Sequence, residues 1–143
     1  MSEERQGPAP PSPHRTINPE SLGRPWGFSH AVAPGPGRPV YLAGQTGHGP
    51  DDSLPDGLVE QFDAACRNVV AALLAAGGRP EHLVSMQIFT TDLAGYVADS
   101  KGIGRAYRAL FGRHFVATGL FEVSALIGGA KVELMCVAVI PES

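Results

Sequence analysis

The sequence predicts an α+β fold in which one mixed β-sheet carries two α-helices on one of its faces. Amphipathic segments alternate with short apolar segments in the order strand, strand, helix, strand, helix, strand, strand. The chain has 143 residues, 43% of them apolar, which is enough for one hydrophobic core. The last strand-like segment is apolar on both sides, as is typical of a strand in a covered sheet.

The N-terminal part of the chain predicts a tail followed by a hairpin. Residues 1–14 are rich in proline and poor in large apolar side chains, so we expect a disordered tail there and a single domain over 15–143. Residues 28–32 and 39–47 have the composition of strands, and the Pro- and Gly-rich segment 33–39 joins them. A β-hairpin is therefore expected.

Two helices are predicted by apolar side chains that recur every three or four residues. The first covers residues 56–76, with Asp56 as its N-cap and Gly77-Gly78 as its stop. The second covers residues 99–114. Its apolar face consists of Ile103, Ala106, Tyr107, Leu110 and Phe111.

Three further strands are predicted over residues 82–93, 120–126 and 130–139. Alternation divides the last of them into two largely apolar sides. Since both helices cover one side, another subunit is the economical cover for the other, and a trimer or another closed ring would bring Glu133 to an interface. One side holds Val132, Leu134, Cys136 and Ala138, and the other holds Lys131, Glu133, Met135, Val137 and Val139.

Composition and charge argue against several classes of function. The net charge is −3 and no block of Lys or Arg occurs, so nucleic acid is not expected as a partner. No apolar run is long enough to span a membrane and no secretion signal is recognisable, so we expect no membrane partner and a cytoplasmic location. Cys66 and Cys136 are expected to be reduced core residues. The histidines lack metal-ligand spacing, so no metal and no cofactor are predicted.

Glu133 is the sharpest candidate for chemistry because it is the one carboxylate in the apolar run 131–140. A carboxylate removed from water needs a partner or a function. An apolar setting raises the pKa of a carboxyl group, which suits acid–base catalysis near neutral pH. The alternative is a structural glutamate that bonds to backbone or to a neighbouring lysine.

Other polar residues have weaker claims to a function. Glu122 is expected in an ion pair at an edge or interface. The segment 44–49, GQTGHG, could bring a ligand close to backbone N–H groups, although an ordinary turn is the default. Ser29 and His30 are conceivable as a nucleophile pair, but adjacent strand residues point to opposite faces.

Six segments between about Asn18 and Val139 follow one another as in a known family. The segments are LAGQTG (42–47), VEQFDAACRNVVAALLAAGG (59–78), VSMQIFTTDL (84–93), AYRALFG (106–112), FEVSAL (121–126) and KVELMCVAV (131–139). They resemble the strands and helices of the reactive intermediate deaminase family (Rid, also called YjgF). The resemblance implies a chorismate-mutase-like α+β domain that assembles as a homotrimer with ligand clefts between subunits.

The resemblance also implies a reaction, the hydrolysis of reactive enamines and imines to ketoacids and ammonia. In that family an arginine holds the substrate carboxylate and a glutamate on the last strand positions the attacking water. The glutamate corresponds to Glu133, whereas Thr118 stands where the arginine should be and Phe28 replaces a tyrosine. Because threonine cannot form a charged, bidentate pair, carboxylate binding should weaken by about one to two orders of magnitude.

Three functions remain open. The first is an enzyme for an imine, an enamine or a similarly labile intermediate that lacks the usual carboxylate, with Glu133 as the acid–base or water-positioning group. The second is a standard 2-imino acid deaminase with Arg24, Arg38 or Arg113 as a substitute cation. The third is a non-catalytic trimer that binds a small ligand. Substrate contacts are expected from Thr118, Phe28, Ser29, His30, Gln45, Gly44 and Leu120, with Trp26 as a further wall.

Overall fold

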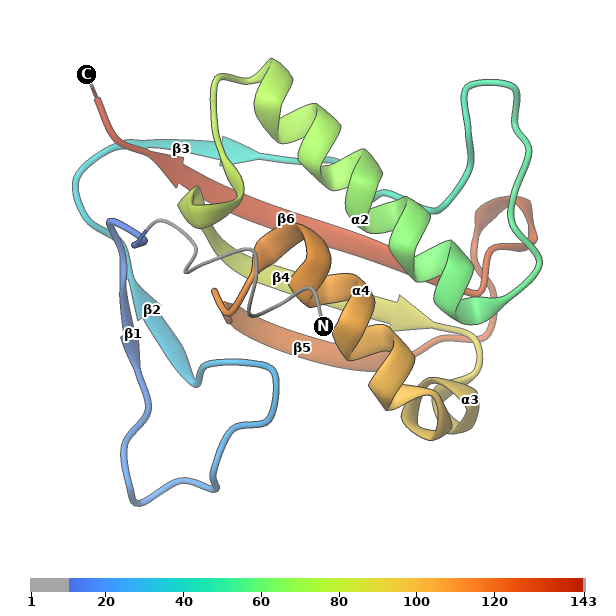
Figure 1. Ribbon diagram of the computed structural model, residues 1–143, viewed down its shortest axis with the longest axis horizontal. Coiled ribbons are helices and arrows are strands. Elements are labelled where there is room, and N and C mark those ends of the chain that lie inside the picture. Colours follow the sequence, from blue (N-terminus) through green and yellow to red (C-terminus); the bar gives the residue numbers. More distant parts are fainter. Residues whose placement is uncertain (1–10, 143) are drawn as a thin grey trace.

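The computed structural model, which describes residues 11–142, is built on a mixed four-stranded sheet (Figure 1). Two of its neighbouring strands are parallel and the other pairs are antiparallel. The parallel pair is possible because the chain crosses over through helices between those two strands. In order across the sheet, the strands are β3 (Arg38–Tyr41), β6 (Val132–Ile140), β4 (Leu83–Thr90) and β5 (Ala117–Glu122).

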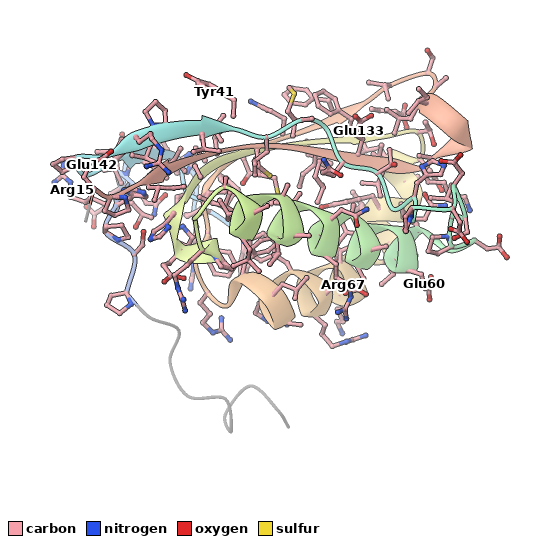
Figure 2. All side chains as sticks on the ribbon, turned by 90° about the horizontal axis from the view of Figure 1, so that it is seen from above. Arg15, Tyr41, Glu60, Arg67, Glu133 and Glu142 are labelled. Carbon is pink, nitrogen blue, oxygen red and sulfur yellow. The ribbon has the colours of Figure 1, made fainter. Side chains whose placement is uncertain are left out.

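Both long helices, α2 (Leu58–Ala75) and α4 (Ser100–Phe111), lie on the same face of this sheet (Figure 2). This confirms the predicted α+β arrangement. The predicted inward side of β6 is buried beneath α2. Each fully buried valine or leucine side chain stabilises the fold by about 1.5–3 kcal/mol. The core includes Phe62, Val69, Leu73, Met86, Val132, Leu134, Cys136 and Ala138.

The ends of the helices differ in part from the sequence prediction. Gly57, not Asp56, is the N-cap of α2, and no side chain bonds to the free N–H groups there. The predicted stop is confirmed. Gly77 adopts a φ of +88°, and the N–H groups of Gly77 and Gly78 donate to the carbonyl oxygens of Leu74 and Leu73.

A short helix, α3 (Leu93–Ala98), was not predicted. The expected strand over 82–93 ends at Thr90 because the Asp92 side chain accepts a hydrogen bond from the Gly95 N–H at 2.9 Å. This N-cap begins a new helical turn where the apolar pattern suggested a continuing strand. Strand β5 also differs from its expected span of 120–126, since it is in register with β4 from Ala117 onward.

The predicted hairpin between residues 28–32 and 39–47 is wrong. Strand β2 (Ala31–Ala33) pairs with β1 (Arg15–Ile17) in a separate two-stranded ribbon, while β3 pairs with β6. The Pro- and Gly-rich segment between β2 and β3 is therefore a connection from the ribbon to the far edge of the main sheet, not a tight turn (Figure 1).

Most of the predicted tail, residues 1–14, lies outside the described residues, but its last part packs against the domain. The Ser12 hydroxyl donates to the carbonyl oxygen of Glu81 at 2.7 Å. The His14 side chain is buried, and its Nε2 lies 2.8 Å from the carbonyl oxygen of Val139. Ordered packing thus begins before Arg15.

Two neighbouring histidines predict a loss of stability in mild acid. Burial lowers the pKa of His114 and of His82 below the ordinary value of 6.5. The unfolded chain therefore binds more protons than the folded chain as the pH falls through and below 6.5, so the free energy of unfolding should fall over this range.

Denaturant titrations at about pH 7.5, 6.5 and 5.5 would measure this effect. Carboxyl groups with ordinary pKa values near 4 stay ionised over this range, so they contribute little to the change. His114→Gln, whose amide can still donate to the carbonyl oxygen of Leu83, should flatten the pH dependence. A variant with the same slope as the wild type would contradict the assignment.

Candidate functional site

The two residues most relevant to the predicted reaction lie on opposite faces of the main sheet. Thr118 is in register with Met86, whose side chain is fully buried beneath the helices. Glu133 is in register with Phe89, three positions further along β4. Because directly opposed residues share a face and successive residues alternate, Thr118 faces the helices and Glu133 faces away from them. One protomer does not bring the two side chains together.

Gly44 allows the backbone to pass directly beside the Glu133 carboxylate. A Cβ built on Gly44 would lie 3.0 Å from the Cδ of Glu133 and would overlap its Oε2. The neighbouring Gln45 exchanges two backbone hydrogen bonds with Leu134, at 2.7 and 2.9 Å, which hold this segment against β6. Gly44 therefore forms the immediate wall of the Glu133 side chain, and Gln45 anchors the segment to β6.

The Glu133 carboxylate has no hydrogen-bond or ion-pair partner among residues 11–142. The nearest lysine in sequence, Lys131, donates from its Nζ to the carbonyl oxygen of Asp56 at 2.9 Å. The partners expected of a purely structural glutamate are thus not provided within the described protomer. Glu133 is half-buried, so its carboxylate is reachable by water or a small ligand.

Replacing Gly44 by alanine should impair any reaction at Glu133 without unfolding the domain. The new Cβ would overlap the carboxylate and force it to a different rotamer, and misplaced catalytic groups lose activity by about tenfold or more. The assay would compare kcat with that of Gly23→Ala, where a Cβ meets no atom within 4 Å. Equal kcat values for both variants and the wild type would show that the position of Glu133 does not matter.

Apolar side chains surround Glu133 on the face of the sheet that no described helix covers. Phe89 and Phe121 stack with their ring centroids 5.7 Å apart. Tyr41 is 78% exposed and Met135 is 44% exposed. Figure 2 shows Tyr41 and Glu133 on the side of the sheet away from α2. The uncovered, largely apolar side predicted for the last strand is therefore present, and such a patch is typical of an interaction surface.

A cleft of about 1480 Å³ lies on the other side, between the loop that joins β1 to β2 and the start of β5 with helix α4. Thr118, Phe28, Ser29 and Trp26, all predicted as substrate contacts or walls, line it. The remaining lining residues include three arginines, Arg24, Arg108 and Arg113, and several aromatic side chains. The structure thus divides the predicted site residues between this cleft and the Glu133 face.

Several predicted substrate contacts do not line the helix-side cleft. Gly44 lies beside Glu133, and Gln45 is paired with Leu134 of β6. His30 is held by its own contacts, with Nε2 2.6 Å from the carbonyl oxygen of Gly23. Leu120 is in register with Ile88 near the sheet edge and is 39% exposed.

Ser29 and His30 do not form a nucleophile pair. The buried Ser29 hydroxyl donates to the carbonyl oxygen of Phe115 at 2.7 Å, and the His30 ring packs edge-on against Phe28. Glu122 also has a different contact from the expected ion pair, because its Oε1 accepts a hydrogen bond from the Leu93 N–H at 3.0 Å. It thus stabilises the first turn of α3.

The two cysteines are buried core residues, as predicted. Burial raises the pKa of both thiols, to about 12 for Cys136, so neither is suited to act as a nucleophile. Within residues 11–142, no group of three or more His, Cys, Asp or Glu side chains is arranged to hold a metal ion. The same part of the chain has no helix that is both long and apolar enough to cross a bilayer.

Some residues of both surfaces were missed from the sequence. The stacking of Phe89 on Phe121 depends on the parallel register of β4 with β5, and the sequence does not specify that register. The placement of Arg108 could have been predicted from the sequence, because Gly104 lies one helical turn before it and leaves room for its guanidinium. A Cβ at Gly104 would lie 2.9 Å from the Nη1 of Arg108.

Comparison with known proteins identifies relatives of the whole domain. The family model described as Endoribonuclease L-PSP matches residues 20–140. A 2-iminobutanoate/2-iminopropanoate deaminase from Capra hircus is 30% identical over 71% of this chain and 73% of its own. RutC family protein UK114 from Drosophila melanogaster is 31% identical over 71% of this chain and 72% of its own.

Solved structures agree with this relationship. The Rid family protein YyfB from Yersinia pestis, a protein of unknown function, superimposes with a TM-score of 0.79 at 26% identity over 90% of this chain and 99% of its own. TdcF from E. coli with bound serine has a TM-score of 0.64 at 25% identity, over 85% of this chain and 92% of its own.

Proposed function

This chain belongs to the Rid (YjgF) family, and from this premise we propose that it is an enzyme that hydrolyses a reactive imine or enamine. The observation that carries the proposal is the Glu133 carboxylate, which lies beside Gly44 on the last strand and has no partner among the described residues. Relatives at about 30% identity are named 2-iminobutanoate/2-iminopropanoate deaminases, which supports this class of reaction.

In the proposed reaction, Glu133 accepts a proton from a water molecule as that water attacks the electrophilic carbon of the imine. The imine nitrogen takes up a proton, and the carbinolamine that results then breaks its C–N bond to release ammonia and a carbonyl compound. The net reaction converts the imine and one water molecule into a ketone or aldehyde and ammonia. A carboxylate with no competing hydrogen bond is suited to hold and deprotonate this water.

We propose that the active assembly is a homotrimer with the ligand cleft between subunits. Thr118 and Glu133 are on opposite faces of one sheet, so a site that uses both must take them from two protomers. The exposed apolar side chains Tyr41, Phe121 and Met135 supply a surface that a neighbouring subunit would bury.

Thr118 indicates that the substrate differs from the 2-imino acids of the named relatives. Its hydroxyl donates to the carbonyl oxygen of Val116 at 2.8 Å and carries no charge, so strand β5 provides no ionic contact for a carboxylate at this position. The proposed substrate is therefore an imine or enamine whose binding does not require an ionic contact between a substrate carboxylate and residue 118.

A second candidate is a 2-imino acid deaminase that uses a substitute cation. Arg24 and Arg113 line the same cleft as Thr118, which favours this alternative. Arg38 is at the other end of the sheet, where it contacts Glu142 at 3.9 Å and the carbonyl oxygen of Ala76. The net charge of −3 does not favour RNA as the substrate.

The test is ammonia release from freshly generated imines, after light scattering has established the oligomeric state. 2-Iminopropionate would be compared with uncharged imines of similar size. Faster turnover of the uncharged imines would support the first proposal, and efficient turnover of 2-iminopropionate would support a substitute cation. An assembled protein that turns over none of them would be a non-catalytic ligand-binding protein.

A further inference from the structure

We propose that the Thr46 hydroxyl and the His48 imidazole form a proton relay that serves the nitrogen atom of the substrate at the Glu133 site. This role rests on the proposed imine hydrolysis, in which the nitrogen must gain a proton while Glu133 takes one from the attacking water. Both residues belong to the segment 44–49, whose first residue, Gly44, lies beside the Glu133 carboxylate.

The side chains of Thr46 and His48 are in direct contact. Oγ1 of Thr46 lies 2.7 Å from Nδ1 of His48, which is the distance of a good hydrogen bond between a hydroxyl group and an imidazole. A hydroxyl group that is bonded in this way can give a proton to a substrate and recover one from the ring.

The Thr46 side chain faces the same side of the sheet as Glu133. Gln45 and Leu134 form a β-bridge, so the next residues outward along this pairing are Thr46 and Glu133. Gly47 faces α2, since a Cβ built on it would lie 3.2 Å from a side-chain Cβ of that helix. Because successive side chains alternate, that of Thr46 points away from α2. Opposed residues of a regular antiparallel pair have Cβ atoms about 4.5–5.5 Å apart, so one small substrate can contact both.

Helix α2 holds the backbone of the relay in place. The side-chain amide of Asn68 donates to the carbonyl oxygen of Thr46 at 2.8 Å and to that of His48 at 3.1 Å. Gly47, which lies between them, passes so close to the helix that its Cβ would be 2.8 Å from the carbonyl oxygen of Gln61. These contacts fix the segment on a rigid element, as a site for proton transfer requires.

The second ring nitrogen of His48 is accessible to solvent. Among residues 11–142, Nε2 of His48 has no hydrogen-bond partner, whereas every buried side-chain nitrogen or oxygen has one. Nε2 is therefore not buried and can exchange protons with water. Gly128 provides the space, because a Cβ at this position would lie 2.7 Å from Nε2. The imidazole thus connects Thr46 on one side with solvent on the other.

The protons balance over the two steps of the proposed hydrolysis. First the water oxygen bonds to the imine carbon, Glu133 takes a proton from the water, and the C=N electron pair moves to the nitrogen, which takes the Thr46 hydroxyl proton. The Thr46 oxygen recovers a proton from Nδ1 of His48, and Nε2 takes one from solvent. In the second step the C–N pair leaves with the nitrogen, which takes the proton from Glu133. The hydroxyl proton of the carbinolamine returns to solvent through Thr46 and His48.

Thr46 variants test the hydroxyl group. The substrates would be freshly generated 2-iminopropionate and its uncharged analogue 2-iminopropionamide, and the variants would be assayed with the one that the wild type turns over faster. Thr46→Val keeps the shape of the side chain without the hydroxyl, so it should lower kcat by about 100-fold and leave KM unchanged. Thr46→Ser keeps the hydroxyl and should retain most of the wild-type kcat. Thermal unfolding would verify that each variant is folded.

His48→Ala tests the ring. It should lower kcat about as much as Thr46→Val, and added imidazole should restore part of the loss, since a free ring can take the vacated place. Imidazole should not restore Thr46→Val, which lacks the hydroxyl group. The matched control is His82→Ala, which removes a histidine that precedes the opposite end of β4 and should leave kcat unchanged.

Two neighbouring glycines test the position of the ring. Gly128 and Gly129 have positive φ angles of +64° and +74°, so alanine is similarly strained at both positions. A Cβ at Gly128 would displace the His48 ring, whereas a Cβ at Gly129 would meet no atom within 4 Å. Gly128→Ala should therefore lower kcat by about tenfold or more relative to Gly129→Ala.

Wild-type kcat in Thr46→Val or in His48→Ala would overturn the relay, as would equal kcat values in the two glycine variants. If Glu133→Gln lost turnover while the relay variants kept it, the proposed hydrolysis would stand and only the relay would be refuted. A wild-type protein that turned over neither imine would refute the hydrolysis and the relay together.

Discussion

Replacing Glu133 by glutamine is expected to lower kcat for imine hydrolysis by at least about 100-fold, because a general base contributes about 10²–10⁴ to the rate. The amide has nearly the shape of the carboxylate but cannot accept the proton of the attacking water. Since Glu133 is half-buried and bonds to no described residue, the substitution removes no contact that the fold needs. Ammonia release under saturating substrate would measure kcat, and thermal unfolding would verify that the fold is intact.

Glu142→Gln is the matched control for this experiment. Glu142 follows the same strand and carries the same charge, but it is exposed at the far end of the sheet beside Arg38 (Figure 2). Its replacement should leave kcat unchanged. If Glu133→Gln retained wild-type turnover, the proposed role of this carboxylate would be wrong, whatever the substrate.

Installing an arginine at position 118 is the second large effect that we expect. Thr118→Arg should lower KM for 2-iminopropionate by about ten- to a hundredfold, since hydrogen bonds to charged groups are worth about 1.5–3 kcal/mol. The Thr118 side chain is half-buried on the edge strand β5 and opens into the helix-side cleft, so a longer side chain has space to extend. KM for an uncharged imine should not change.

Thr118→Gln separates the effect of charge from that of length. This variant provides a long polar side chain without a cation, and its KM for 2-iminopropionate should stay within about threefold of the wild-type value if charge is what matters. An unchanged KM in Thr118→Arg, together with tight binding by the wild type, would instead identify one of the cleft arginines as the cation that already holds the carboxylate.

The candidate site was only partly predictable. Glu133, Gly44 and Gln45 stand in short motifs, and the structure brings Gly44 and Glu133 into direct proximity. The separation of Thr118 from Glu133 depended on register, because a shift of one residue moves a strand side chain to the opposite face of a sheet. No local pattern specifies the register of β5 against β4, which are joined through two helices.

Elements with local signals in the sequence could be predicted. Helical periodicity predicted α2 and α4, strand alternation predicted which side of β6 is buried, and the Gly77-Gly78 pair predicted the end of α2, because each reflects interactions between residues a few positions apart. Strand pairing and the contacts made by each loop could not be predicted in this way, because they depend on residues that are distant in the sequence. Ribbon β1–β2 replaced the expected hairpin, because no local signal specified which strand β2 pairs with. The loop that the ribbon carries brought Arg24 and Trp26 to a cleft beside α4, where the facing residues lie about 80 positions later in the chain.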